Sequence, residues 1–239
     1  MLEYTLLILA AYFAAILSGT AGFGGALLLL PLLIEVVGTM HAVPLLTVIQ
    51  FIGNLARVCF GFQQIQWKPV SLFLLSAIPF SILGAVSFAE LPKDLITRFI
   101  GAAILLFVML KYVGVLNLKI SPFSLIAGGS LVGFLSGLLG SAGPLGAAIF
   151  LSLGLSPVAY IASEGTTALA IHGVKIITYH QYIILDQDLW LLAAFMGVAM
   201  IAGSWSAKQV IEYMPQKKFE RYVTVLLVVL AIYLIVYGS

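Results

Sequence analysis

Charged residues are scarce in this chain. They make up 8% of its 239 residues, whereas hydrophobic residues make up 62%. Soluble domains carry about 25% charged residues, so this composition excludes an ordinary soluble domain and predicts an integral membrane protein. The net charge of +2 is too small and too scattered for a nucleic-acid-binding surface. We therefore expect membrane lipid around the protein and no nucleic-acid partner.

Cysteine occurs once, as Cys59 inside an apolar run. A single cysteine excludes an internal disulfide and offers no metal cluster, and we expect it to pack inside the protein. The chain also lacks a Walker A motif, and its three histidines are scattered. An intramembrane enzyme would need paired carboxylates, a nucleophile with its base, or a metal site. We therefore expect no enzyme activity, no cofactor and no metal.

The chain does contain a glycine-rich break, 18–25, that occurs a second time as 136–143. At an offset of 118 residues, four small residues of the two breaks coincide: Ser18, Gly19, Gly22 and Gly25 with Ser136, Gly137, Gly140 and Gly143. Because 118 is close to half of 239, we interpret the chain as a duplication, with a first transmembrane repeat at 1–118 and a second at 119–239.

Apolar runs fill the rest of the chain. About 20 apolar residues in a helix cross roughly 30 Å of hydrocarbon. The expected segments are 2–17, 26–37, 41–62, 70–88, 95–115, 123–135, 144–154, 157–182, 189–209 and 218–237. The predicted fold class is all-α: a polytopic transmembrane bundle of two four-segment halves, each opened by a glycine-broken or re-entrant helix.

Lysine and arginine in the short loops favour inverted halves over parallel ones. Inversion leaves only Lys93 and Arg98 outside and places the others inside or near that face: Lys68, Lys111, Lys119, Lys208, Lys217, Lys218 and Arg221. It also requires 1–37 and 121–154 to be broken helix pairs with glycines deep in the membrane. Irregular backbone at that depth lines a cavity or is buried, and two matching breaks indicate a transporter's binding site. Alternatively, the glycines only let helices pack closely.

Three stretches resemble the TauE/SafE sulfite exporter family of membrane permeases. They are Gly22-Phe23-Gly24-Gly25 with the apolar run that follows, its echo at 135–144, and Ala162-Ser163-Glu164-Gly165-Thr166-Thr167-Ala168-Leu169. The resemblance covers the full length. It implies transport of sulfite, organosulfonates and related small anions across the cytoplasmic membrane of a prokaryote. The chain departs from the more glycine-rich family pattern at Ala26 and at 141–142.

The candidate substrate-binding residues come from the breaks and from two polar helix faces. Glycine lets backbone N–H groups approach an anion closely. In 41–62 the polar residues lie within about 80° of one another, and in 157–182 within about 140°. The full set is Gly22, Phe23, Gly24, Gly25, Thr47, Gln50, Asn54, Arg57, Gly140, Ser141, Gly143, Thr166, Thr167 and Lys175. Arg57 and Lys175 are the candidates for attracting an anion, although each could instead reach the interface.

Glu164 and His172 are the candidate coupling residues, because their charge can change within a membrane. They are eight positions apart, or about 12 Å along a helix, which is too far for a direct hydrogen bond. Their functional interpretation is a proton relay that couples export to the proton gradient. The alternative is that Glu164 satisfies backbone groups at the break and His172 bonds a neighbouring carbonyl.

The sequence favours a secondary transporter that exports a small sulfur-containing anion by alternating access, coupled to an ion gradient. A passive anion channel on the same scaffold is the first alternative, and an intramembrane enzyme is a weaker one. The oligomeric state stays open, a homo-oligomer included.

Overall fold

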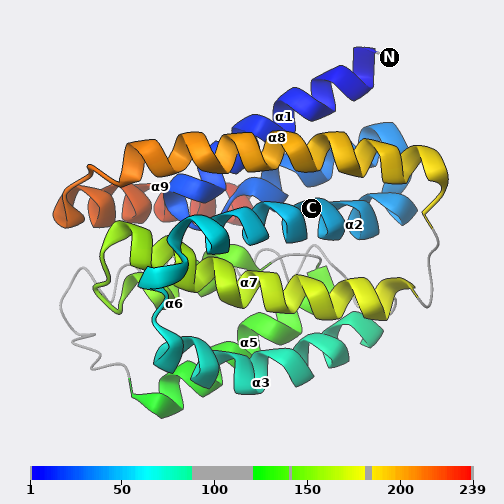
Figure 1. Ribbon diagram of the computed structural model, residues 1–239. Helices are drawn as coiled ribbons and strands as arrows, with labels where there is room; N and C mark the ends of the chain where they lie inside the picture. The colour runs from blue at the N-terminus through cyan, green and yellow to red at the C-terminus, as the bar shows by residue number, and fades with distance from the viewer. Residues whose placement is uncertain (1, 88–120, 140–141, 181–184, 238–239) are drawn as a thin grey trace.

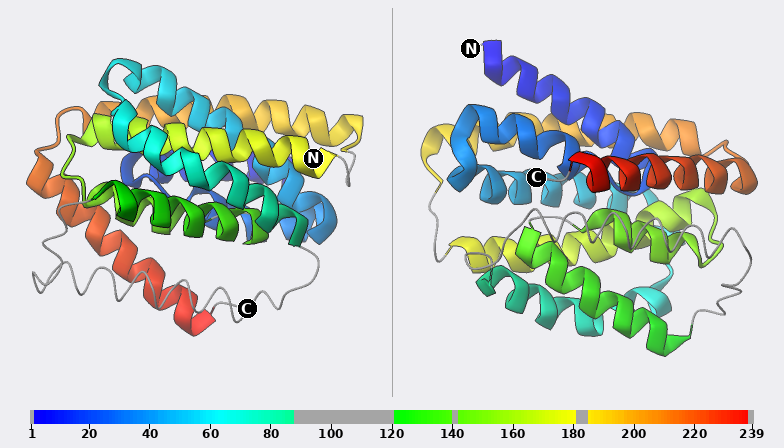
Figure 2. Two further views of the ribbon diagram at one scale, coloured as in Figure 1. Left: turned by 90° about the horizontal axis from the view of Figure 1, so that it is seen from below. Right: turned by 180° about the vertical axis from the view of Figure 1, so that it is seen from behind.

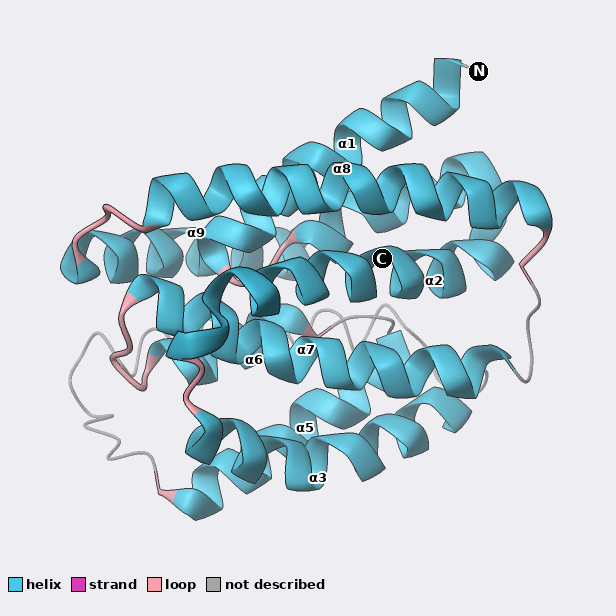
Figure 3. Ribbon diagram, in the orientation of Figure 1, coloured by secondary structure: helices cyan, strands magenta, loops and turns pink. Residues whose placement is uncertain are grey.

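The computed structural model describes residues 2–87, 121–139, 142–180 and 185–237. Within these residues the chain is helical, and short loops join the helices (Figure 3). The expected span 95–115 lies outside the described residues. The elements are α1 (Leu2–Ala21), α2 (Gly25–Gly61), the 3-10 turn η1 (Phe62–Gln64), α3 (Trp67–Val86), α5 (Pro122–Leu139), α6 (Gly143–Leu151), α7 (Pro157–His180), α8 (Gln187–Ile211) and α9 (Gln216–Tyr237).

The helices are those of a membrane bundle, as the composition predicts. Four segments of the described residues are long and apolar enough to cross a membrane: Glu3–Ala21, His41–Gln64, Trp67–Val86 and Gln187–Ile211. Large apolar side chains such as Phe13 and Leu75 are 62% and 68% exposed, which suits a surface against lipid. Cys59 is also exposed, so the expectation that it packs inside was wrong. A thiol behaves as a small hydrophobe and tolerates that surface.

The first glycine break is shorter than the sequence suggested. Helix α1 continues to Ala21, and only the three residues before Gly25 leave the helix. Gly22 and Gly24 have φ of 87° and 100°, a left-handed conformation that glycine adopts without strain. Gly19 stays helical, and a β-carbon there would stand 2.6 Å from the β-carbon of Ala207 on α8. Gly19 therefore serves close packing, not the break.

Close packing also explains three glycines of α5, which continues to Leu139. They recur every fourth residue and lie on one face of the helix. A β-carbon on any of them would collide with a backbone carbonyl of α3: Gly129 with Phe73, Gly133 with Ala77 and Gly137 with Ser81. Gly137 thus has the packing role that was the alternative to a binding role. Gly140 and Ser141 lie outside the described residues.

Helix α2 consists of two parts joined at Gly38. That residue has φ of 77° and ψ of 160°, which no α-helix contains. In Figure 2 the chain turns back at this point, so 25–38 returns beside α1 and 39–61 recrosses the molecule. The chain from α1 to Gly38 is therefore a broken helix pair that begins and ends at the same end of the bundle.

The long helices lie side by side in pairs. In Figure 1, α1 and α8 both run from right to left and pack along each other. Helices α3 and α5 pack in the same way but run from left to right. Between these pairs, α7 runs from left to right against 39–61 of α2, which runs the other way. This central pair, α2 with α7, carries most of the polar side chains predicted to act.

Candidate transport site

The site is built around Arg57, one turn before the end of α2. Arg57 is 5% exposed, and its side chain extends from α2 to α1 and α7. Nη1 donates to the carbonyl oxygen of Ser18 at 3.0 Å, just before the first break. Nη2 forms an ion pair and hydrogen bond with Oε2 of Glu164 on α7. Arg57 therefore links α2 to both α1 and α7.

Tyr160 lies one turn before Glu164 on the same face of α7. Its hydroxyl donates to the carbonyl oxygen of Ala21 at 2.9 Å, and the carbonyl oxygen of Ala147 is 3.3 Å away. A β-carbon at Gly22 would stand 2.7 Å from this hydroxyl. Sequence reasoning missed Tyr160, although its spacing of four from Glu164 placed it on the polar face. It holds the first break against the helix that carries Glu164.

An inner cavity of about 30 Å³ lies beside Glu164. Its wall combines the second break with the middle of α7, and includes Ser136, Gly143, Glu164, Thr167 and His172. Glu164 is 3% exposed and His172 is 7% exposed. Both coupling candidates therefore line one internal space, although they are eight positions apart along the helix.

A second cavity, of about 10 Å³, lies beside Arg57 and Lys208. It is the outer cavity in the sense that it lies nearer the end of the bundle where α8 ends. It is lined by residues of α1, α2, α7 and α8, among them Gly19, Arg57, Val158, Ser204 and Lys208. Because Arg57 lines the outer cavity and Glu164 lines the inner one, the ion pair lies between the two cavities.

Comparison with known proteins gives one match. The family model described as "Sulfite exporter TauE/SafE" matches residues 7–234. The chain belongs to the TauE/SafE family. No curated protein and no solved structure matches it. This is a family of membrane transporters of sulfur anions, so the expected class of protein is confirmed.

Several polar residues predicted for the TauE/SafE site are bonded within their own helices. Thr47 donates to the carbonyl oxygen of Val43 at 2.8 Å, and Thr166 donates to that of Ala162 at 2.7 Å. Thr167 donates to the carbonyl oxygen of Glu164 at 2.8 Å while it lines the inner cavity. Of the three threonines, only Thr167 adjoins either cavity described above.

The amide of Gln50 is directed at the first break. Its Nε2 would lie 3.0 Å from a β-carbon at Gly25, and it has no hydrogen-bond partner among the described residues. Asn54, one turn further along α2, is buried. Phe23, inside the break, is 5% exposed and belongs to an apolar cluster, so it packs the break against the bundle.

Both candidate cations are buried within the protein. Arg57 and Lys175 are 5% and 0% exposed, a burial that favours a role inside the protein over extension to the interface. Helices packed on all sides of the α2–α7 pair enclose both side chains. In the part of the chain that the structure describes, no three His, Cys, Asp or Glu side chains gather as metal ligands. The geometry instead offers buried positive charge and hydrogen-bond donors, which suit an anion.

Proposed function

We propose that this TauE/SafE protein is a secondary transporter that exports a small sulfur-containing anion, such as sulfite or a sulfonate. It works by alternating access between two inverted halves in the cytoplasmic membrane of a prokaryote. Proton binding is coupled to the anion. The observation that carries the proposal is the buried Arg57, which is bonded on both sides but keeps its Nε–H without a partner among the described residues.

The pairing of helices supports inverted repeats at 1–118 and 119–239. An offset of 118 makes α1 equivalent to α5, α3 to α8, and 39–61 of α2 to α7. This equivalence maps the packed pair α1 with α8 onto the packed pair α5 with α3. Equivalent helices also run in opposite directions in Figure 1. A two-fold relation between inverted halves has these consequences.

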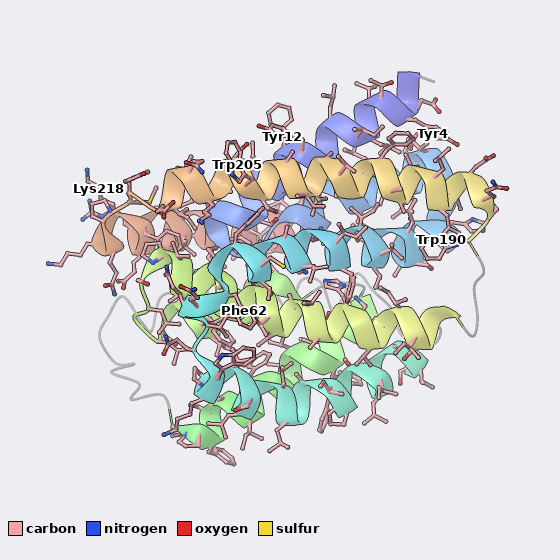
Figure 4. All side chains as sticks on the ribbon, in the orientation of Figure 1. Tyr4, Tyr12, Phe62, Trp190, Trp205 and Lys218 are labelled. Carbon is pink, nitrogen blue, oxygen red and sulfur yellow. The ribbon has the colours of Figure 1, made fainter. Side chains whose placement is uncertain are left out.

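The distribution of charge supports an orientation. The end of the bundle where α8 ends and α9 begins carries the basic residues Lys208, Lys217, Lys218 and Arg221. Lys218 is labelled at this end in Figure 4, and Tyr4 and Trp190 lie at the opposite end. That opposite end carries Glu3, Asp186 and Asp188. Since basic residues collect on the cytoplasmic side, the end near Lys218 faces the cytoplasm.

Arg57 is suited to bind an oxyanion. A guanidinium is planar, remains charged and donates in parallel to two oxygens. A charge buried at this depth is costly unless it is paired, and here Glu164 supplies the partner. An anion that enters the site therefore competes with Glu164 for the same guanidinium.

This competition couples the anion to a proton. Protonation of Glu164 removes the negative charge that holds Arg57, so proton and anion bind together and move in the same direction. The inner cavity, at about 30 Å³, has room for about two water molecules. Water in this cavity can contact both Glu164 and His172, because both line it, although they lie roughly 12 Å apart along the helix. Because the proton moves with the anion, an inward proton gradient opposes export, and the outward concentration gradient of the anion must exceed it for net export.

The test is uptake of labelled sulfite and of a panel of sulfonates into proteoliposomes, with and without an acidic exterior. Protein-free liposomes correct for sulfur dioxide, which forms from bisulfite in acid and crosses lipid unaided. We expect saturable uptake that an acidic exterior accelerates, and loss of uptake in Arg57→Gln. Arg57→Lys keeps the buried positive charge, and its amount in the membrane is compared with that of Arg57→Gln as the control for expression.

The outcomes separate the alternatives. If no sulfur anion is taken up, the substrate class is wrong. Uptake that does not saturate and is not accelerated by substrate inside the vesicles indicates a channel instead of alternating access. Wild-type rates in Arg57→Gln would contradict the role of the buried arginine.

A further inference from the structure

The outer cavity gathers hydrogen-bond donors whose capacity is unused. Arg57 Nε and Ser204 Oγ are both buried and have no hydrogen-bond partner among the described residues. The two side chains are 5% and 3% exposed. Unpartnered buried donors are costly and uncommon. Both residues line the outer cavity, and Arg57 Nε lies on the α7 side, where a β-carbon at Gly165 would stand 3.0 Å from it.

Lys208 adds a second positive charge to this cavity. It follows Ser204 by one turn of α8, so the two side chains lie on the same helix face. Lys208 also lines the outer cavity. The one ion pair found in the described part of the chain, Arg57 with Glu164, does not involve it. Two cations and a hydroxyl on one cavity favour an oxyanion as ligand.

The position of the outer cavity fits an entry to the central site. Along α7, Val158 and Ile161 line the outer cavity, and Thr167 and His172 line the inner one. Glu164 lies between these positions. Lys208 is in the last turn of α8, at the basic end of the bundle. An anion that enters from this end therefore meets Lys208 before it meets Arg57.

We propose that Ser204 and Lys208 form, beside Arg57, an outer binding site for the sulfur oxyanion at the end where α8 ends. From this site the anion passes to Arg57 when Glu164 is released. The proposal rests on the proposed function and adds two residues on α8 to it. The cavity of about 10 Å³ holds about one water molecule. Entry of an anion therefore requires the half-buried Lys208 side chain to move outward.

The experiment measures KM and kcat for sulfite uptake, together with equilibrium binding of labelled sulfite to the purified protein. The variants are Lys208→Gln, Lys208→Arg and Ser204→Ala. Lys217→Gln is the matched control, because it removes the same charge at the same end of the bundle from an exposed residue that does not line the cavity. Thermal unfolding of each purified variant checks its fold.

We expect Lys208→Gln to raise KM and the dissociation constant about tenfold, as loss of a charge-assisted hydrogen bond predicts. Its kcat should stay near the wild-type value, since the central arginine is intact. Lys208→Arg should restore most of the affinity. Ser204→Ala should raise KM about threefold, as loss of a weaker neutral hydrogen bond predicts. Lys217→Gln should leave KM unchanged.

Two results would overturn the outer site. One is a KM in Lys208→Gln that matches the Lys217→Gln value while wild type transports sulfite. The other is a Lys208→Gln variant in which kcat falls while KM and the dissociation constant stay at the wild-type values. Absence of sulfite uptake and binding in wild type would instead reject the proposed function, and the outer site with it. The two failures are therefore distinguishable.

Discussion

Removing one charge of the Arg57–Glu164 pair should destabilise the protein far more than removing both. Arg57→Gln leaves a buried carboxylate without its partner, and Glu164→Gln leaves a buried guanidinium without its own. Both side chains are at most 5% exposed, so water cannot replace the lost partner. Breaking a buried pair in this way costs about 3–5 kcal/mol.

The double variant Arg57→Gln, Glu164→Gln removes both charges, so no unpaired buried charge remains. Two facing amides of similar size hydrogen-bond each other, and replacing a buried pair is often close to neutral. The coupling in the double-mutant cycle should therefore be several kcal/mol and opposite in sign to the sum of the single losses.

Thermal unfolding of the four purified proteins in one detergent measures this cycle. For a chain of this size, 1 kcal/mol shifts Tm by about 2–4 °C. Each single variant should then lose roughly 6–20 °C, and the double variant much less. The reasoning would be refuted if the losses of the two single variants added up in the double variant, or if the single variants had the same Tm as wild type. Such results would mean that water reaches these side chains.

Three further predictions concern the break and the orientation. Gly22→Ala should cost about 1–3 kcal/mol of stability because alanine is strained at positive φ, and it should also slow transport by displacing Tyr160. Gly154→Ala, also at positive φ but exposed in a loop, should cost stability and leave transport intact; equal transport losses would contradict a specific role for the break. Tyr160→Phe should cost about 1–3 kcal/mol in thermal unfolding, and an unchanged Tm would argue against its carbonyl contacts. Cysteines at 63–66, between α2 and α3, and at 186–187, where α8 begins, placed in a Cys59→Ser background, should react with an impermeant maleimide from opposite faces; reaction from one face would rule out inverted halves.

The sequence by itself determined the class of protein and most helix boundaries. Long apolar runs with few charges leave the backbone no partner except itself, so helices follow directly from composition. It also located the polar faces of α2 and α7, because helical periodicity depends only on spacing. Gly38 ended one apolar run in the sequence and is the turn of α2 in the structure.

The sequence did not separate glycines that break a helix from glycines that pack against one. Gly19 and Gly22 are three residues apart in the same motif, yet Gly19 is helical and Gly22 has positive φ. What distinguishes them is the neighbour each one meets, Ala207 for the first and Tyr160 for the second. These neighbours lie more than a hundred residues away in the chain.

The ion pair and the two cavities were decided only by tertiary structure. Arg57 and Glu164 are 107 positions apart, and no local pattern links them. Their meeting depends on α7 packing antiparallel against the second part of α2. In the sequence, Ser204 gave no signal and Lys208 indicated only orientation, because a serine and a lysine near a helix end are ordinary on a membrane helix. They gain meaning only because α8 places them on the cavity that Arg57 also lines.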